Sequence, residues 1–266
     1  MTRNFSLFVV IAWLVMALAP LLLPFHPNDV QLEKILLGPG AEAWLGYDDL
    51  GRAMWDRLVT GARTSLMVAA VAVSLSLVMG ALVGATSGYM GGAVDHLIVR
   101  IMDVLLAFPG ILLAIALAGV LGPGIDNVVI ALTAVGWVGF ARLARAQVLA
   151  QKRREHVLAA VALGATRWRV ITIHLLPLIA APLIVEATFA IAGVVIAEAG
   201  LSYLGLGVQP PASSWGSMIR DGTRYMLVAP HMVIVPGAAM MLVVLAVNLL
   251  GDQLRDWLDV KTRDKS

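Results

Sequence analysis

The sequence predicts an all-α, polytopic membrane protein with about six transmembrane helices. Apolar residues make up 60% of the 266 positions and charged residues only 14%, whereas a soluble domain carries about a quarter charged residues. The apolar residues gather in runs of roughly 20, the length that a helix needs to cross a bilayer. The connections between these runs are short, so no large soluble domain is left over.

The first apolar run, residues 5–23, is interpreted as a retained transmembrane helix. At about 19 residues it is longer than the apolar core of a secretory signal peptide, which holds about 7 to 15 residues. Pro20 and Pro24 end the run, and no small-residue cleavage pattern follows them. We therefore expect this run to stay in the chain and to cross the membrane once.

A polar segment, residues 24–63, follows the first span. The stretch 44–66 is amphipathic, with Trp44 and Trp55 among its apolar residues and charged side chains between them. Tryptophan beside an apolar stripe favours a helix that lies at the membrane interface. Most of the charged side chains here are expected to be solvated: Asp48, Asp49, Arg52, Asp56 and Arg57.

Five more spans are expected, at about residues 65–88, 97–121, 125–147, 177–199 and 232–250. In the second span Gly80 and Gly84 lie four residues apart, a spacing that allows two spans to pack closely. Residues 252–266 follow the last span as a tail, and its final part, 261–266, is expected to be disordered.

Ionisable residues near the membrane interior are candidates for the translocation path, because such groups usually face a bundle interior or a wet cavity. They are Asp103, Glu186 and Glu198. Bridging or capping of helices is an equal alternative for each. Asp103 also shares a helix face with Arg100, three residues before it, so the two could pair. Pro109 interrupts the helix after them.

The largest polar interruption in the second half is residues 152–177. It opens with three basic residues, continues as a short amphipathic helix from Glu155, and breaks at Gly164 before a second basic group. A helix this short and basic cannot span a bilayer. It is expected at the cytoplasmic surface, where its small Ala/Gly face could dock into a groove on a partner protein.

The distribution of basic residues predicts the orientation. With both termini inside, thirteen of the 19 Lys and Arg residues fall on the cytoplasmic side and six outside. Cytoplasmic loops of membrane proteins carry such an excess of Lys and Arg. Both termini and the 152–177 loop are therefore expected in the cytoplasm.

The 152–177 loop resembles the coupling loop of ABC importer permeases, whose pattern is Glu-Ala-Ala, three residues, Gly, nine residues, Ile-x-Leu-Pro. Here Leu158, Ala159 and Ala160 stand in the first three places, Gly164 follows at the expected spacing, and Leu176-Pro177 close the motif. Leu158 stands where Glu is usual, and His174 where Ile is usual. Both departures resemble the dipeptide, oligopeptide and nickel branch, which carries a Glu three residues earlier, as Glu155 is here.

Four other stretches resemble the C-type permeases of that branch. They are residues 44–66, residues 88–117 with the pattern G-Y-x-G-G-x-x-D, residues 200–222 with Tyr203 where Phe is common, and residues 251–259. The motifs occur in the family's order over nearly the whole chain. The chain is thus identified as a member of this family of inner-membrane permeases.

The resemblance implies a type I ABC importer permease with three parts. They are an N-terminal helix and extracytoplasmic segment (1–63), a transmembrane core (64–251) that contains the coupling loop, and a cytoplasmic tail (252–266). Implied partners are a second homologous permease, two ATP-binding subunits, an extracytoplasmic substrate-binding protein and membrane lipid. ATP and Mg²⁺ would be used by the ATP-binding subunits, and this chain would need no cofactor of its own.

The resemblance also assigns the contact with the ATPase to nine residues of the loop: Arg153, Arg154, Glu155, Ala159, Ala160, Gly164, Ala165, Arg167 and Arg169. The arginines could pair with acidic ATPase residues, and attraction to anionic lipid head groups is an even alternative. The implied substrate is a di- or oligopeptide. Nickel or a metal chelate is the alternative within the class, and a stand-alone secondary transporter the alternative outside it.

No catalytic or metal-binding constellation is found in the sequence. It has no GxxxxGK[ST] phosphate-binding loop and no cysteine, and its histidines are scattered rather than paired four apart. His26 and His231 are expected outside, where they could touch a metal or a peptide. A membrane enzyme is disfavoured because no nucleophile, base and ligand set converges. A formal charge of +2 is too weak to indicate nucleic acid.

Overall fold

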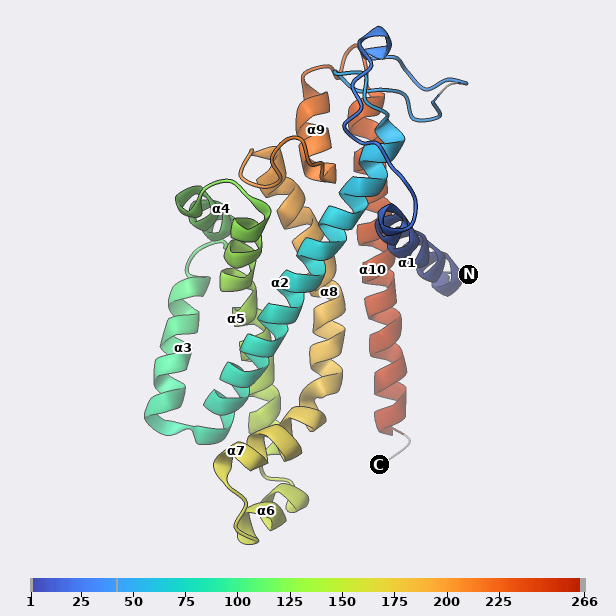
Figure 1. The fold of residues 1–266 in the computed structure, drawn as a ribbon. Helices are drawn as coiled ribbons and strands as arrows, with labels where there is room; N and C mark the ends of the chain where they lie inside the picture. The colour runs from blue at the N-terminus through green and yellow to red at the C-terminus, as the bar shows by residue number, and fades with distance from the viewer. Residues whose placement is uncertain (1, 42, 264–266) are drawn as a thin grey trace.

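A computed structural model describes residues 2–41 and 43–263 of the chain. Within these residues the regular secondary structure is helical, and the only β-type pairing is an isolated bridge between Tyr47 and Ala53. Long helices run side by side through the bundle (Figure 1). Helix α9 (Trp215–Thr223) lies at one end, and helix α6 (Glu155–Ala162) lies at the other. We call these the α9 end and the α6 end.

Five helices are long and apolar enough to cross a membrane. They are α1 (Thr2–Leu18), α2 (Met54–Met90), α5 (Ile125–Gln151), the continuous helix Arg167–Tyr203 that contains α8 (Leu176–Tyr203), and α10 (His231–Arg263). A bent pair of shorter helices supplies a sixth span if it is counted as one. The expectation of an all-α protein with about six transmembrane helices is confirmed.

The third span is broken rather than straight. Helices α3 (Gly92–Leu106) and α4 (Gly110–Leu121) meet at 86°. Pro109 stands between them, since proline lacks a backbone N–H and disfavours helical geometry in the residue before it. The interruption expected at Pro109 is confirmed, and it divides the span expected at 97–121 into two helices. The expected pairing of Arg100 with Asp103 is absent, and both of these described side chains are exposed.

The separate interfacial helix expected at 44–66 is not formed. The stretch before Met54 is a loop of turns, and α2 then runs without a break for 37 residues. At 1.5 Å per residue this helix is about 55 Å long, whereas the hydrocarbon core of a bilayer is about 30 Å thick. Helix α2 is therefore longer than a single perpendicular crossing of the hydrocarbon requires.

The small residues of α2 let it lie directly against α5. A Cβ atom added at Gly84 would overlap the backbone of Ala141, and one added at Gly80 would lie 2.5 Å from the carbonyl oxygen of Trp137. The close packing expected from Gly80 and Gly84 is confirmed. It joins the first half of the core to the helix that leads into the 152–177 loop.

Helix α10 continues through most of the expected tail. It runs as one helix to Arg263, so residues 261–263 are helical rather than disordered. The expected disorder of residues 264–266 lies outside the described part of the chain. The tail is thus an extension of the last span towards the α6 end (Figure 1).

Candidate functional site

The 152–177 loop projects from one end of the bundle as a single protrusion (Figure 1). Helix α6 is held to the bundle by Val157, which is fully buried. Val157 belongs to an apolar cluster with Val148 of α5 and with Val170 and Leu175 beyond the loop. One buried side chain therefore anchors α6, and the rest of its surface faces outward.

The outward surface combines apolar and basic side chains. Leu158, Val161 and Trp168 are exposed, and Leu163 is 89% exposed. Four arginines frame them, all exposed, and none makes an ion pair with another described residue: Arg153, Arg154, Arg167 and Arg169. An exposed apolar patch with a charged rim is typical of a protein-contact surface.

The predicted coupling residues all lie on this protrusion. Most of them are exposed, and two are half-buried, Ala160 and Ala165. They are neighbours in sequence, and the short helix and turn keep them on one surface. We call this set, together with Leu158, Val161, Leu163 and Trp168, the α6 surface.

Gly164 sets the direction in which the chain leaves α6. Its φ is +83°, in the left-handed region where glycine ends helices without strain. The turn is closed by two bonds of 3.0 Å, from the Gly164 N–H to the Val161 carbonyl and from the Ala165 N–H to the Ala160 carbonyl. A Cβ atom at Gly164 would meet nothing within 4 Å. The requirement for glycine is therefore conformational rather than steric.

The loop is joined to the last part of the core by continuous helix. After Gly164, Thr166 caps a helical turn, α7 (Arg167–Arg169), and its hydroxyl accepts from the Arg169 N–H over 3.3 Å. A π-helical segment, η3 (Val170–Leu175), then leads into α8. The sequence predicted that this span begins at Pro177, and the π-helical segment before it was missed. The α6 surface is thus joined to α8 by unbroken helix.

An ion pair fixes the other side of the loop. Arg145 of α5 donates to the Asp95 carboxylate of α3 through two bonds of 2.6 and 2.7 Å. Nearby, the Lys152 ammonium donates to the Gly88 carbonyl over 2.8 Å. These three bonds join the last part of α5 to the end of α2 and the start of α3. Sequence reasoning missed this pairing because its partners are 50 residues apart.

The three candidate path residues lie in different surroundings. Asp103 is exposed on α3. Glu186 lines a cavity of about 480 Å³ between α5, α8 and α10, which Arg255 and Gln151 also line. Glu198 is buried and accepts from the hydroxyls of Ser202 at 2.7 Å and Ser65 at 3.2 Å. The structure does not bring these three carboxylates together.

The α9 end holds a charge cluster that was expected to be solvated. Asp48 accepts from Arg52 Nε at 2.7 Å and from Arg57 Nη1 at 2.6 Å, and all three side chains are buried. Arg57 also lies 3.5 Å from Asp221 of α9. Burial, with the nearby Asp48 charge, raises the pKa of Asp49. The expectation of solvated charges is wrong for Asp48, Arg52 and Arg57.

The outer histidines have structural contacts. His231, expected to be available outside, is buried, and its Nε2 lies 3.0 Å from the Tyr47 carbonyl oxygen. His26 is exposed, and its backbone N–H donates to Asp56 over 3.0 Å. Among residues 2–41 and 43–263, no group of three or more His, Asp or Glu side chains is arranged to hold a metal ion.

Comparisons with known proteins agree on one family. Residues 77–264 match the model of the "Binding-protein-dependent transport system inner membrane component". The chain is 42% identical over 259 residues to the dipeptide transport system permease protein DppC of Alkalihalophilus pseudofirmus, covering 97% of this chain and 85% of that protein. It is 40% identical over 259 residues to the glutathione transport system permease protein GsiD of Pectobacterium atrosepticum, covering 97% and 86%.

A further relative and a solved structure extend this agreement. The chain is 37% identical over 265 residues to the probable D,D-dipeptide transport system permease protein DdpC of Escherichia coli, covering 100% and 89%. An inward-facing MetNI methionine ABC transporter matches with a TM-score of 0.61 over 76% of this chain and 96% of that chain. At 20% identity, the structural match establishes a shared fold.

Proposed function

The chain belongs to the family of binding-protein-dependent transport system inner membrane components, and from this premise we propose that it is the permease of an importer of di- and oligopeptides. The relatives named above are dipeptide and glutathione permeases, and glutathione is itself a tripeptide. Their names support a peptide as the substrate. The finer choice among peptides belongs to the partner that captures the substrate.

We infer that the α6 surface is where this chain contacts the ATP-binding subunits. An ATP-binding subunit would bind over Leu158, Leu163 and Trp168, and its acidic residues would pair with the surrounding arginines. ATP and Mg²⁺ would be bound by that subunit, and closure of two such subunits would move this surface. Because α7, η3 and α8 form one continuous helix of 37 residues, the movement would reach the core as a rigid-body shift.

The orientation follows from the same assignment. The α6 end would face the cytoplasm of a bacterial cell, with both termini on that side, and the α9 end would face outward. The excess of basic residues at the α6 end supports this orientation. An extracytoplasmic binding protein would then deliver the substrate to the α9 end.

A second permease would complete the path. Arg100 and Asp103 are exposed on α3 within the bent span, and an ionised side chain in a bilayer requires a polar partner or water. A neighbouring permease subunit or a water-filled path would supply these surroundings. Glu186 with Arg255 offers opposite charges around the 480 Å³ cavity near the α6 end, large enough for a small ligand.

The experiment that tests the substrate compares uptake in cells with and without this chain. Labelled dipeptide, labelled glutathione and radioactive nickel would be supplied separately. The proposal predicts that loss of the chain abolishes uptake of dipeptide or glutathione and leaves nickel uptake unchanged. Loss of nickel uptake alone would contradict the peptide assignment, and uptake that continues without ATP-binding subunits would contradict the importer assignment in favour of a secondary transporter.

A further inference from the structure

The cavity of about 480 Å³ that Glu186 lines lies towards the α6 end, between the last turns of α5, the first half of α8 and the last part of α10. We call it the α8 cavity. Most of its wall is apolar, and its polar side chains come from all three helices: Gln147 and Gln151 from α5, Glu186 from α8 and Arg255 from α10. One site therefore combines a carboxylate, a guanidinium and two carboxamides.

The helical period places these polar groups on the faces that line the cavity. Gln147 and Gln151 are four residues apart on α5, and Pro182 and Glu186 are four residues apart on α8. Side chains at this spacing lie on one face of a helix. The polar groups are thus carried by helices rather than by loops, so their relative positions are set by the packing of the bundle.

The two charged groups of the α8 cavity do not neutralise each other. Glu186 and Arg255 are exposed, and neither makes an ion pair or a side-chain hydrogen bond with another residue in the described part of the chain. An ionised side chain on a membrane-spanning helix requires a polar partner or water. A negative and a positive group are therefore both available to a ligand in the same cavity.

Two further acceptors at the cavity lack donors. The Gln151 side-chain oxygen is buried and has no hydrogen-bond partner among the described residues. Pro182 lies inside α8 and has no N–H, so it cannot donate to the carbonyl of Leu178 four residues earlier, and both residues line the cavity. Buried polar atoms are normally paired. These acceptors, together with the Glu186 carboxylate, favour a ligand that carries several N–H donors.

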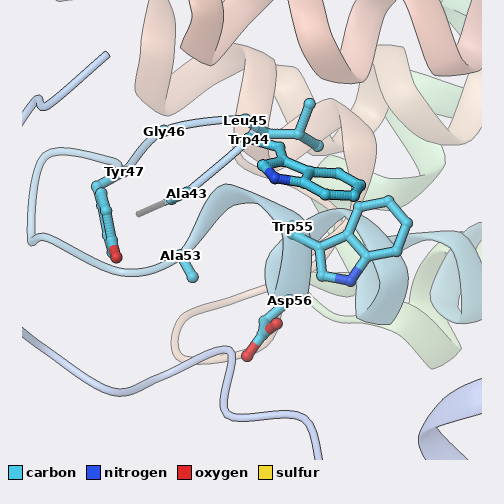
Figure 2. Close-up of a pocket in the computed structure, with 8 residues that line it drawn as sticks. All are labelled: Ala43, Trp44, Leu45, Gly46, Tyr47, Ala53, Trp55 and Asp56. Carbon is cyan, nitrogen blue, oxygen red and sulfur yellow. The ribbon is translucent and has the colours of Figure 1, made fainter. Parts of the chain in front are cut away.

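The larger pocket at the α9 end lacks such free groups. Figure 2 shows Trp44, Trp55, Tyr47 and Asp56 around it. The Lys34 ammonium donates to the Tyr47 hydroxyl over 3.2 Å, and Asp56 accepts from the backbone N–H of His26 over 3.0 Å. The polar groups of that pocket are thus already paired within the chain, whereas those of the α8 cavity are open to a ligand.

We propose that the α8 cavity binds a small zwitterionic peptide and recognises both of its termini. The ammonium group would pair with Glu186, the carboxylate would pair with Arg255, and the carboxamides of Gln147 and Gln151 would bond the peptide amide. Apolar lining residues such as Phe189 would contact its side chains. A volume of about 480 Å³ falls in the range of sites for small ligands.

This inference rests on the proposed function, because it takes a peptide as the substrate and the α6 end as the cytoplasmic end. The cavity would then hold an imported peptide on the cytoplasmic side before its release. Such a site selects for free termini, independently of the partner that captures the substrate outside.

The test uses the complete importer, with both permeases and the ATP-binding subunits, in nanodiscs and without the extracytoplasmic binding protein. Binding of radiolabelled Ala-Phe is measured directly, with N-acetyl-Ala-Phe and Ala-Phe amide as competitors. The first competitor lacks the ammonium and the second lacks the carboxylate. We expect each competitor to bind about tenfold more weakly than the free dipeptide, because each loses one hydrogen-bonded charge.

Two variants assign each terminus to its residue. Glu186→Gln should bind free and N-acetylated dipeptide equally but still discriminate against the amide. Arg255→Gln should show the reverse pattern, with discrimination against the N-acetylated dipeptide alone. A merely structural role of either residue would weaken all three ligands together and would not exchange these preferences.

Matched controls come from two of the same helices. Asp256 of α10 and Arg142 of α5 are exposed and charged, but neither lines the cavity. Asp256→Asn and Arg142→Gln are expected to keep the wild-type affinity for all three ligands. Recovery of each variant complex with its ATP-binding subunits in the wild-type amount shows that the variants fold.

Three outcomes would overturn the inference. The wild-type importer could bind no dipeptide, or the Glu186 and Arg255 variants could keep the wild-type preferences. Phosphatidylethanolamine, whose headgroup also joins an ammonium to an anion, could co-purify with wild type and be lost from both variants while dipeptide binding stays unchanged; the cavity would then be a lipid site. Uptake in cells is measured in parallel. Peptide uptake that continues leaves the proposed function intact in all three cases, whereas its absence would contradict the proposed function itself.

Discussion

Nη1 of Arg57, in the first turn of α2, lies 2.6 Å from Oδ2 of Asp48, and both side chains are buried. Asp48 also accepts from Arg52, and Arg57 reaches Asp221 on α9. One carboxylate thus holds two guanidinium groups and joins the outer loop to α2 and α9. This cluster fixes the α9 end of the molecule in the absence of any strand or disulfide in the described residues.

The first prediction concerns removal of that carboxylate. Asp48→Ala leaves two buried guanidinium groups without their shared partner, and removing one member of a buried ion pair costs about 3–5 kcal/mol. We expect a clearly lower thermal unfolding midpoint for the purified importer. Asp29→Ala is the control. The Asp29 carboxylate is exposed and forms a long ion-pair contact of 4.0 Å with the exposed His26 ring; such surface pairs are worth about 0–1 kcal/mol. Equal stability of the two variants would show that the cluster is not structural.

A second prediction tests the contact between α2 and α5 with two identical substitutions. Gly84→Ala places a methyl group against the backbone of Ala141, and such overpacking costs about 1–3 kcal/mol. Gly139→Ala, on α5, meets nothing within 4 Å and is expected to leave stability unchanged or slightly raised. Unfolding of the assembled importer measures both. Equal stability of the Gly84→Ala and Gly139→Ala proteins would mean that α2 and α5 are not in direct contact at Gly84 and Ala141.

The third prediction separates the structural role of Glu198 from a role in substrate contact. Glu198→Leu leaves the Ser65 and Ser202 hydroxyls without their acceptor, at about 1–3 kcal/mol for each unpaired group. Glu198→Gln can pair with both hydroxyls and should retain stability and uptake. Both quantities are measured for both variants. Loss of uptake in a fully stable Glu198→Gln importer would instead place Glu198 on the path.

Orientation supplies a fourth prediction, because the chain has no cysteine of its own. Leu32→Cys and Leu163→Cys introduce single thiols at exposed positions near opposite ends of the bundle. A maleimide that cannot cross the membrane should label the first in intact cells and the second only after permeabilisation. Labelling of Leu163→Cys in intact cells would reverse the proposed topology.

The features that could be predicted from sequence are those encoded locally. Apolar runs fix the number of spans, and the four-residue spacing of Gly80 and Gly84 indicates close helix packing. The α6 surface could also be located, because its residues are neighbours in sequence and Gly164 marks the turn. Pro109 indicates an interruption, but the 86° bend depends on how α3 and α4 pack against α5 and α8.

Contacts between residues far apart in the sequence could not be predicted from the sequence. Nothing near Asp95 indicates that it pairs with Arg145, and nothing near Tyr47 indicates a bond to His231, 184 residues away. The amphipathic pattern around Trp55 suggested an interfacial helix. Three of the charges in that pattern, Asp48, Arg52 and Arg57, are instead buried together, and Arg57 lies 3.5 Å from Asp221 of α9. Periodicity alone does not distinguish a solvated charge from one buried against a distant partner.

The proposed coupling of ATP hydrolysis to transport through the α6 surface can be measured as ATP-driven dipeptide uptake in cells that carry Gly164→Arg. An arginine at φ +83° is strained and adds a bulky charge to the docking surface, whereas Gly164→Asn is the control because asparagine tolerates the left-handed region. We expect Gly164→Arg to abolish uptake while the permease stays in the membrane, and Gly164→Asn to retain most of the uptake. Normal uptake by Gly164→Arg would show that the α6 surface does not couple ATP hydrolysis to transport.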